Sequence, residues 1–111
     1  MTATPQPLTQ RQQEVLECFR IAAKRLGVQS PRAIIKAGGA VPESIRRARL
    51  VLKLHLYRMG MDWHEIGAYF EVGGDSVRDI VNRHKAKIIH ENETVLRALP
   101  VVSGGSIRFD L

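Results

Sequence analysis

Hydrophobic residues recur at helical spacing in separate runs along the chain. The first run begins at Thr9, which forms a capping-box pattern with Gln12, and its apolar residues continue three and four positions apart up to Gly27. A shorter run over residues 30–39 opens with serine and proline and closes with two glycines. The third run, residues 41–60, carries apolar side chains around its whole circumference, which predicts a central helix packed on several sides.

Two more helices are predicted between residues 62 and 99. Asp62 begins the sequence "DWHE", a capping box in which the glutamate returns the hydrogen bond. A turn containing the glycine pair 73–74 follows. Asp75 or Ser76 is the expected cap of a last helix, which extends to about Leu99 because no helix-breaking residue interrupts it. The pattern predicts an all-α fold, a compact bundle of about five helices.

The length of 111 residues favours one domain, large enough to bury a core and too short for a typical two-domain enzyme. We expect a flexible lead at residues 1–8 and a single helical domain at residues 9–99. Pro100 and two later glycines indicate that residues 100–111 form a tail, either a short strand or a disordered end.

Charge and cysteine content narrow the class of protein. Seventeen Lys and Arg stand against eleven Asp and Glu, and the net charge of +6 favours polyanionic partners. The single cysteine, Cys18, cannot form an internal disulfide and is expected to be a small core residue. The first residues lack the features of a secretory signal, and no apolar stretch approaches the roughly 18 residues that span a bilayer. We therefore expect a cytoplasmic protein without a membrane partner.

Residues 62–90 have the layout of a helix-turn-helix: a short capped helix, a tight glycine-containing turn and a second helix. The second helix has an expected core face, formed by Val77, Ile80, Val81, His84 and Ile88. The opposite face carries Arg78, Asp79, Asn82, Arg83 and Ala86. Arginine can bind the edge of guanine, and asparagine the edge of adenine, through two hydrogen bonds each, and alanine leaves room for a thymine methyl group. The alternative is a solvated face on which Asp79 pairs with Arg83.

A basic stripe on the third predicted helix also favours a nucleic-acid partner. Arg46, Arg49 and Lys53 are spaced at i, i+3 and i+7, Arg47 and Arg58 lie nearby, and no acidic residue stands between positions 44 and 61. Contacts from such a stripe to phosphates would position the protein on DNA and make its affinity salt-dependent.

Two segments, "SIRRARLVLKLHLYRMG" and "DWHEIGAYFEVGGDSV", resemble the C-terminal DNA-binding domain, domain IV, of the bacterial replication initiator DnaA. The resemblance covers about residues 26–90. It implies that Arg46, Arg47 and Arg49 lie in a basic segment that contacts the DNA backbone and minor groove. It also places three residues at the start of the recognition helix, namely Asp75, Ser76 and Arg78.

The chain departs from this family in two respects. Where the family carries an Arg-Asp-His-Thr-Thr run that contacts the initiator's own DNA box, this chain has "GGDSV", so we do not expect it to bind that box. The ATPase domain is also absent, since no G-x-x-x-x-G-K-[ST] motif occurs. The resemblance therefore implies a free-standing DNA-binding domain.

Catalysis and metal binding are not expected. His64 and Glu65 begin an H-E-x-x-H pattern, but Ala68 occupies the position of the second histidine. The four histidines have no ligand-like spacing, and a structural zinc site would need a second cysteine. We predict that the protein is not an enzyme and binds no cofactor.

The sequence thus predicts a sequence-specific double-stranded DNA-binding protein, a nucleoid-associated regulator of transcription or replication in a bacterium or its phage. Its further partners would be a second copy, as a homodimer, or a replication or transcription protein. The alternative is an oligomeric DNA-packaging adaptor such as the small terminase subunit of a phage. The predicted DNA contacts are Arg46, Arg47, Arg49, Lys53, Asp75, Ser76, Arg78, Asp79, Asn82, Arg83 and Lys87.

Overall fold

The chain is helical in the computed structural model, which describes residues 7–35 and 41–108. Within these ranges the protein has six helices and no strand, which confirms the all-α prediction. The helices are α1 (Gln10–Leu26), α2 (Pro31–Ile35), α3 (Glu43–Arg58), α4 (Trp63–Phe70), α5 (Gly74–Glu91) and α6 (Glu93–Ala98). The glycine pair expected to end the second helix, at positions 38 and 39, lies outside the described residues.

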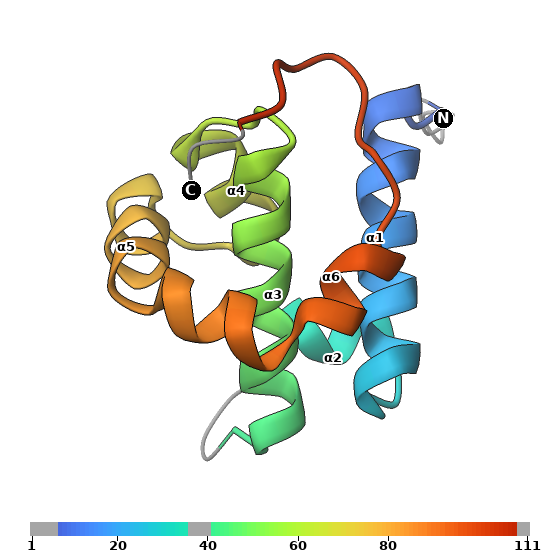
Figure 1. Cartoon of the computed structure of the whole chain (residues 1–111). Coiled ribbons are helices and arrows are strands. Elements are labelled where there is room, and N and C mark those ends of the chain that lie inside the picture. Colours follow the sequence, from blue (N-terminus) through green and yellow to red (C-terminus); the bar gives the residue numbers. More distant parts are fainter. Residues whose placement is uncertain (1–6, 36–40, 109–111) are drawn as a thin grey trace.

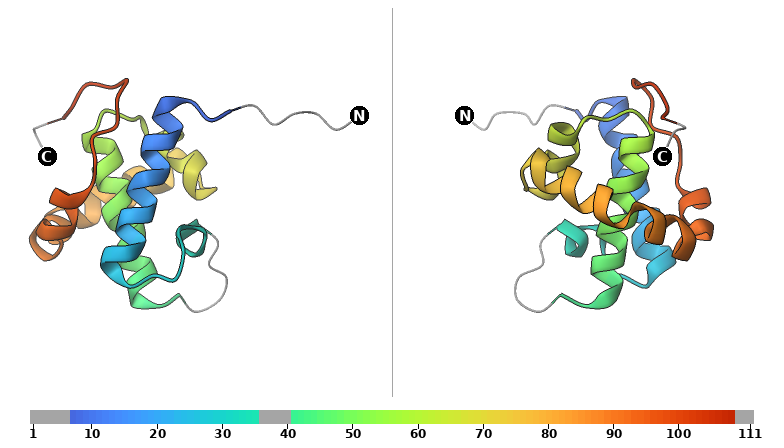
Figure 2. Two further views of the ribbon diagram at one scale, coloured as in Figure 1. Left: turned by 90° about the vertical axis from the view of Figure 1, so that its right-hand side faces the viewer. Right: turned by 60° about the vertical axis from the view of Figure 1, so that its left-hand side comes forward.

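Helix α3 is the centre of the bundle, as its apolar circumference predicts. α1 lies along one side of it and α5 crosses the other side, while α6 packs against both α1 and α3 (Figures 1 and 2). Among the described helices α3 alone contacts all the others. Its six consecutive residues 51–56 are all buried, and they include one lysine and one histidine.

The predicted N-terminal caps of α1 and α4 are present, with one difference. At α1, Thr9 accepts a hydrogen bond from the Gln12 amide at 3.1 Å, and the Gln12 side chain accepts one from the Thr9 amide at 2.9 Å. At α4, Asp62 accepts from the amide of Glu65 at 2.8 Å. The prediction of a return hydrogen bond from Glu65 is wrong, because the Glu65 carboxylate instead accepts hydrogen bonds from the guanidinium of Arg11 at 2.6 and 2.9 Å. That side chain ties α4 to α1.

After the turn that follows α4, helix α5 begins earlier than predicted. The helix starts at Gly74 after Gly73, whose backbone is extended, so the expectation that Asp75 or Ser76 caps it is wrong. Both residues lie in the first turn instead. The left-handed residue of the turn is Glu71, with φ of 58°, and the glycine pair supplies no positive φ.

Two glycines are required in the α4–α5 pair because backbone approaches backbone there. A Cβ atom on Gly67 would lie 2.4 Å from the carbonyl oxygen of Val72, and one on Gly74 would lie 3.0 Å from the amide nitrogen of His64. A Cβ atom on Gly73 would meet nothing within 4 Å. The close packing of the two helices therefore depends on Gly67 and Gly74.

The single last helix predicted to reach Leu99 is wrong, since the helix is interrupted at Asn92. The buried Asn92 side chain donates to the Ile88 carbonyl at 3.0 Å and accepts a hydrogen bond from Nε of Arg47 on α3. Asparagine competes for nearby backbone groups in this way, and the break turns α6 toward α1. The sequence contains no glycine or proline at this point, so the interruption has no simple sequence signal.

The C-terminal segment, residues 100–108, runs from α6 along α1 and back to the end of α3 (Figure 1). Val102 is buried, and the backbone of Ser103 bonds Arg11 at 2.5 Å and Glu14 at 3.2 Å. The amide of Arg108 donates to the carbonyl of Arg58 at 2.7 Å. Through residue 108 the tail thus forms no strand and packs on α1 and α3.

We predict that Gly67→Ala lowers the free energy of unfolding by about 2 kcal/mol or more, because the new methyl group would clash with the carbonyl of Val72. The matched variant Gly73→Ala should leave stability unchanged or raise it by up to about 1 kcal/mol, since its backbone suits alanine and its surroundings are open. Urea unfolding followed by circular dichroism measures both. Equal effects of the two substitutions would contradict the close approach of α4 to the turn.

Candidate nucleic-acid interface

The outer face of α5 is an exposed surface on a well-anchored helix. Val77, Val81 and Ile88 are 0–2% exposed and fix the helix against the core, as predicted, while Ile80 and His84 are half-buried at its edge. The predicted contact residues on this helix are all exposed, namely Asp75, Ser76, Arg78, Asp79, Asn82, Arg83 and Lys87. The helix therefore presents its polar side chains without needing to rearrange.

Charge is unevenly distributed along this face. In the first turns the guanidinium of Arg78 lies 3.4 Å from Asp75 and 3.4 Å from Asp79, so two carboxylates surround one cation. The Asp79–Arg83 pair considered from the sequence is not among the ion pairs of the described residues, and Arg83 projects without an acidic partner there. Arg83 and Lys87 make the C-terminal half of the face basic.

The predicted basic stripe on α3 is not an exposed stripe, and the expectation is wrong for Lys53 and Arg49. Lys53 is only 6% exposed, with its Nζ atom 5.1 Å from the centre of the Phe70 ring. Arg49 donates to the carbonyls of Ile34 at 2.6 Å and Ile35 at 3.2 Å, which end α2. The spacing of the stripe is helical, but this face of α3 packs against α2 and α4 instead of facing solvent.

Arg46 of the stripe and the neighbouring Arg47 differ in their availability. Arg47 is half-buried and bonded to the side chain of Asn92 and, at 3.0 Å, to the carbonyl of Glu91. The side chain of Arg46 is 64% exposed, and its nearest carboxylate, Glu43, is 3.9 Å away. Of the four basic residues predicted from α3, only Arg46 is free to reach a ligand at the surface.

A groove between α3 and α5 connects Arg46 with the face of α5. It has a volume of about 470 Å³ and an apolar floor that includes Leu50 and Ile80. Arg46 and Arg47 line one side, and His84 and Lys87 line the other. Sequence reasoning missed this groove because it depends on where α3 and α5 cross, which no local pattern encodes.

Burial changes the chemistry of three inner side chains. It lowers the pKa of Lys53, with the Arg49 charge as a smaller cause, and it lowers the pKa of His55 although a hydrogen bond to the Pro100 carbonyl acts in the opposite direction. Burial also raises the pKa of Cys18 to about 12, so its thiol remains protonated and unreactive.

The residues that the structure describes contain no metal-binding cluster and no membrane-spanning helix. No group of three or more His, Cys, Asp or Glu side chains there is arranged to hold a metal ion. None of the described helices combines the length and hydrophobicity that crossing a bilayer requires. Comparison with protein-family models, curated proteins and solved structures finds no match to this chain.

We predict that Lys53→Met raises the free energy of unfolding near neutral pH by about 1 kcal/mol, because it removes the cost of burying an ammonium group. The folded-state pKa of Lys53 lies below the ordinary value of 10.5, so the unfolded state binds more protons between the two values. Wild-type stability should therefore rise with pH across that interval, and the advantage of the variant should shrink. Urea titrations over a pH series measure this.

The control for this experiment is Lys87→Met, which alters an exposed lysine on α5. It should change the free energy of unfolding by less than about 0.5 kcal/mol and leave the alkaline trend in place. Loss of stability in Lys53→Met at neutral pH would instead mean that the ammonium group, through its contact with Phe70, is a net stabilising feature.

Proposed function

We propose that this protein binds double-stranded DNA sequence-specifically, as a regulator of transcription or replication, with α4 and α5 acting as a helix-turn-helix. The observation that carries the proposal is the outer face of α5, where Asn82, Arg83 and Lys87 are exposed on a helix whose other side is fully anchored. A helix presented in this way fits the major groove of B-DNA, where arginine and asparagine can each recognise a base by two hydrogen bonds.

The distribution of charge suggests how the helix would lie on DNA. Arg78 shares its charge with Asp75 and Asp79, so the first turns of α5 offer little attraction to phosphate. Arg83 and Lys87 occupy the more basic half, and Arg46 lies across the groove from Lys87. We assign base contacts to Asn82 and Arg83, and phosphate contacts to Arg46 and Lys87.

The likeness of residues 26–90 to domain IV of DnaA supports the same assignment for the α4–α5 pair. The likeness favours phosphate contacts from Arg46, Arg47 and Arg49, of which only Arg46 has a side chain that is both exposed and weakly paired. Because "GGDSV" replaces the family's box-contacting run, the proposed target is a different DNA sequence.

Selection of bound sequences from a random DNA pool, with the oligomeric state measured on the same sample, tests the proposal. An enriched motif supports it, whether asymmetric, as for a monomer, or palindromic, as for a dimer with half-sites about one helical turn apart. A ring-sized oligomer that enriches no motif would instead identify a DNA-packaging adaptor.

We predict that Arg83→Ala weakens binding to the selected site by about 1 to 3 kcal/mol and relaxes its specificity, because a base contact is lost. Arg46→Ala should weaken binding to selected and random DNA alike and lower the slope of affinity against salt by about one, because a phosphate contact is lost. Fluorescence anisotropy over a salt series measures both variants.

Arg20→Ala is the matched control, since it removes one exposed arginine from α1, which does not contact α5. It should leave both the affinity and the salt slope nearly unchanged. The assignment of α5 as the recognition helix fails if Arg83→Ala and Arg20→Ala lose equally little, or if Arg83→Ala loses the same free energy on selected and random DNA.

A further inference from the structure

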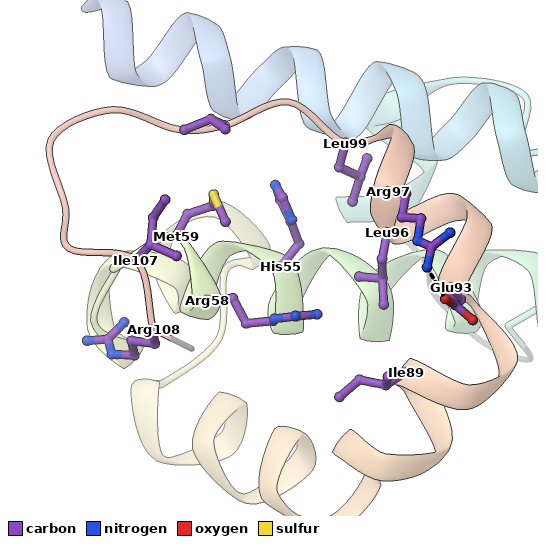
Figure 3. A pocket seen from close by; sticks show the side chains of 11 residues that line it. His55, Arg58, Met59, Ile89, Glu93, Leu96, Arg97, Leu99, Ile107 and Arg108 are labelled. Carbon is purple, nitrogen blue, oxygen red and sulfur yellow. Dashed lines mark hydrogen bonds and ion pairs between the residues drawn. The ribbon is translucent and has the colours of Figure 1, made fainter. Parts of the chain in front are cut away.

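A second groove lies on a different side of the molecule, between α3, α6 and the C-terminal segment (Figure 3). Its volume is about 490 Å³. The only residue that α5 contributes is Ile89, which is none of the side chains assigned to DNA. A ligand in this groove, called here the tail groove, would leave the outer face of α5 uncovered.

The tail groove is apolar and open at its rim. Met59, Ile89 and Leu96 provide apolar surface along it. Val101 and Ile107 on the C-terminal segment are 61% and 41% exposed, and they are two of the five large hydrophobic residues that stand out as exposed in the described chain. Apolar side chains gathered at one groove are typical of an interaction site.

The arginines of the tail groove give it a preference for anions. Three arginines line it against a single glutamate. Arg97 pairs with that glutamate, Glu93, and Arg108 donates to the carbonyls of Tyr57 and Met61 at 2.5 and 2.9 Å. These two guanidinium groups are therefore held at opposite ends of the groove, as Figure 3 shows.

Arg58 lies between these ends, and its surroundings indicate most clearly which ligand the groove would bind. It is half-buried, its side chain lies lengthwise in the groove between Ile107 and Leu96, and within residues 7–35 and 41–108 its guanidinium has no hydrogen-bond or ion-pair partner (Figure 3). A guanidinium in apolar surroundings gains most from a carboxylate, which it binds through two parallel hydrogen bonds.

We propose that the tail groove binds an acidic peptide segment of a partner protein, with bulky apolar residues on either side of its carboxylates. Arg58 pairs with a carboxylate at the centre, and Met59, Leu96 and Ile107 contact the apolar side chains. An extended or helical segment suits a groove that is open along its rim and has a cation at each end. Since the groove and the outer face of α5 are separate, the protein can join this partner to whatever α5 binds.

The experiment is a selection from a random peptide library displayed on phage, on the intact protein, with removal of phage that also bind Arg58→Glu. Enriched peptides that combine Asp or Glu with large apolar residues are expected. A synthetic, fluorescently labelled copy of the most enriched peptide then serves as the probe. Its affinity should fall at least about tenfold for Arg58→Gln and for Ile107→Ser, both of which change partly exposed side chains.

The control Arg83→Ala should bind the probe like the wild type, so a failed DNA proposal leaves this one intact and the reverse also holds. Chemical-shift changes on adding the probe should concentrate at His55, Met59 and Leu96. The proposal is overturned if no peptide is enriched, if enriched peptides lack acidic residues, or if the probe binds Arg58→Gln as well as it binds the wild type.

Two other occupants would also overturn it, and each has its own signature. A second copy in the groove would give concentration-dependent dimers in sedimentation that Arg58→Gln abolishes. If instead the chain's own Asp110 fills the site, the wild type should bind the probe poorly and Asp110→Asn should bind it at least about tenfold better.

Discussion

The rest of the structure depends on the burial of the middle of α3, residues 51–56, around the whole circumference of the helix. A helix with six consecutive buried residues needs neighbours on every side, and α1, α2, α4, α5 and α6 supply them. The cost is that polar residues of α3 also become enclosed. The ammonium group of Lys53 lies over the ring of Phe70, and His55 donates a hydrogen bond from Nε2 to the carbonyl of Pro100, so each buried base has a specific partner.

The parts of the fold that could be predicted from the sequence are those that depend on short segments of the chain. The cap at Thr9, the cap at Asp62 and the central position of α3 follow from local spacing, because capping and circumferential hydrophobicity are properties of a short segment. The burial of Val77, Val81 and Ile88 on the inner face of α5 was also predictable in this way. The interruption at Asn92 was not, since it depends on a hydrogen bond from Arg47 that is 45 positions away.

The exposure of the candidate contact residues was predictable on α5 and unpredictable on α3. Basic residues spaced at i, i+3 and i+7 share one face of a helix, and on an isolated amphipathic helix that face is exposed to solvent. On a helix surrounded by others, the same face can pack against a neighbour. Arg49 therefore donates a hydrogen bond to a carbonyl at the end of α2, and Lys53 is buried in the core. The glycine pair of the turn shows a similar limit. The composition "GG" marks a turn, yet only Gly74 lies in a close approach, and the second required glycine, Gly67, is inside α4.

The side chain of Arg11 links parts of the molecule that have separate roles. It binds both oxygens of Glu65 at the start of α4 and the carbonyl of Ser103 in the C-terminal segment. The orientation of the α4–α5 pair is therefore set partly from outside the pair, by the first helix of the chain. We therefore expect hydrogen exchange at the amides of α4 to be coupled, through Arg11, to the detachment of α1 and of residues 100–108.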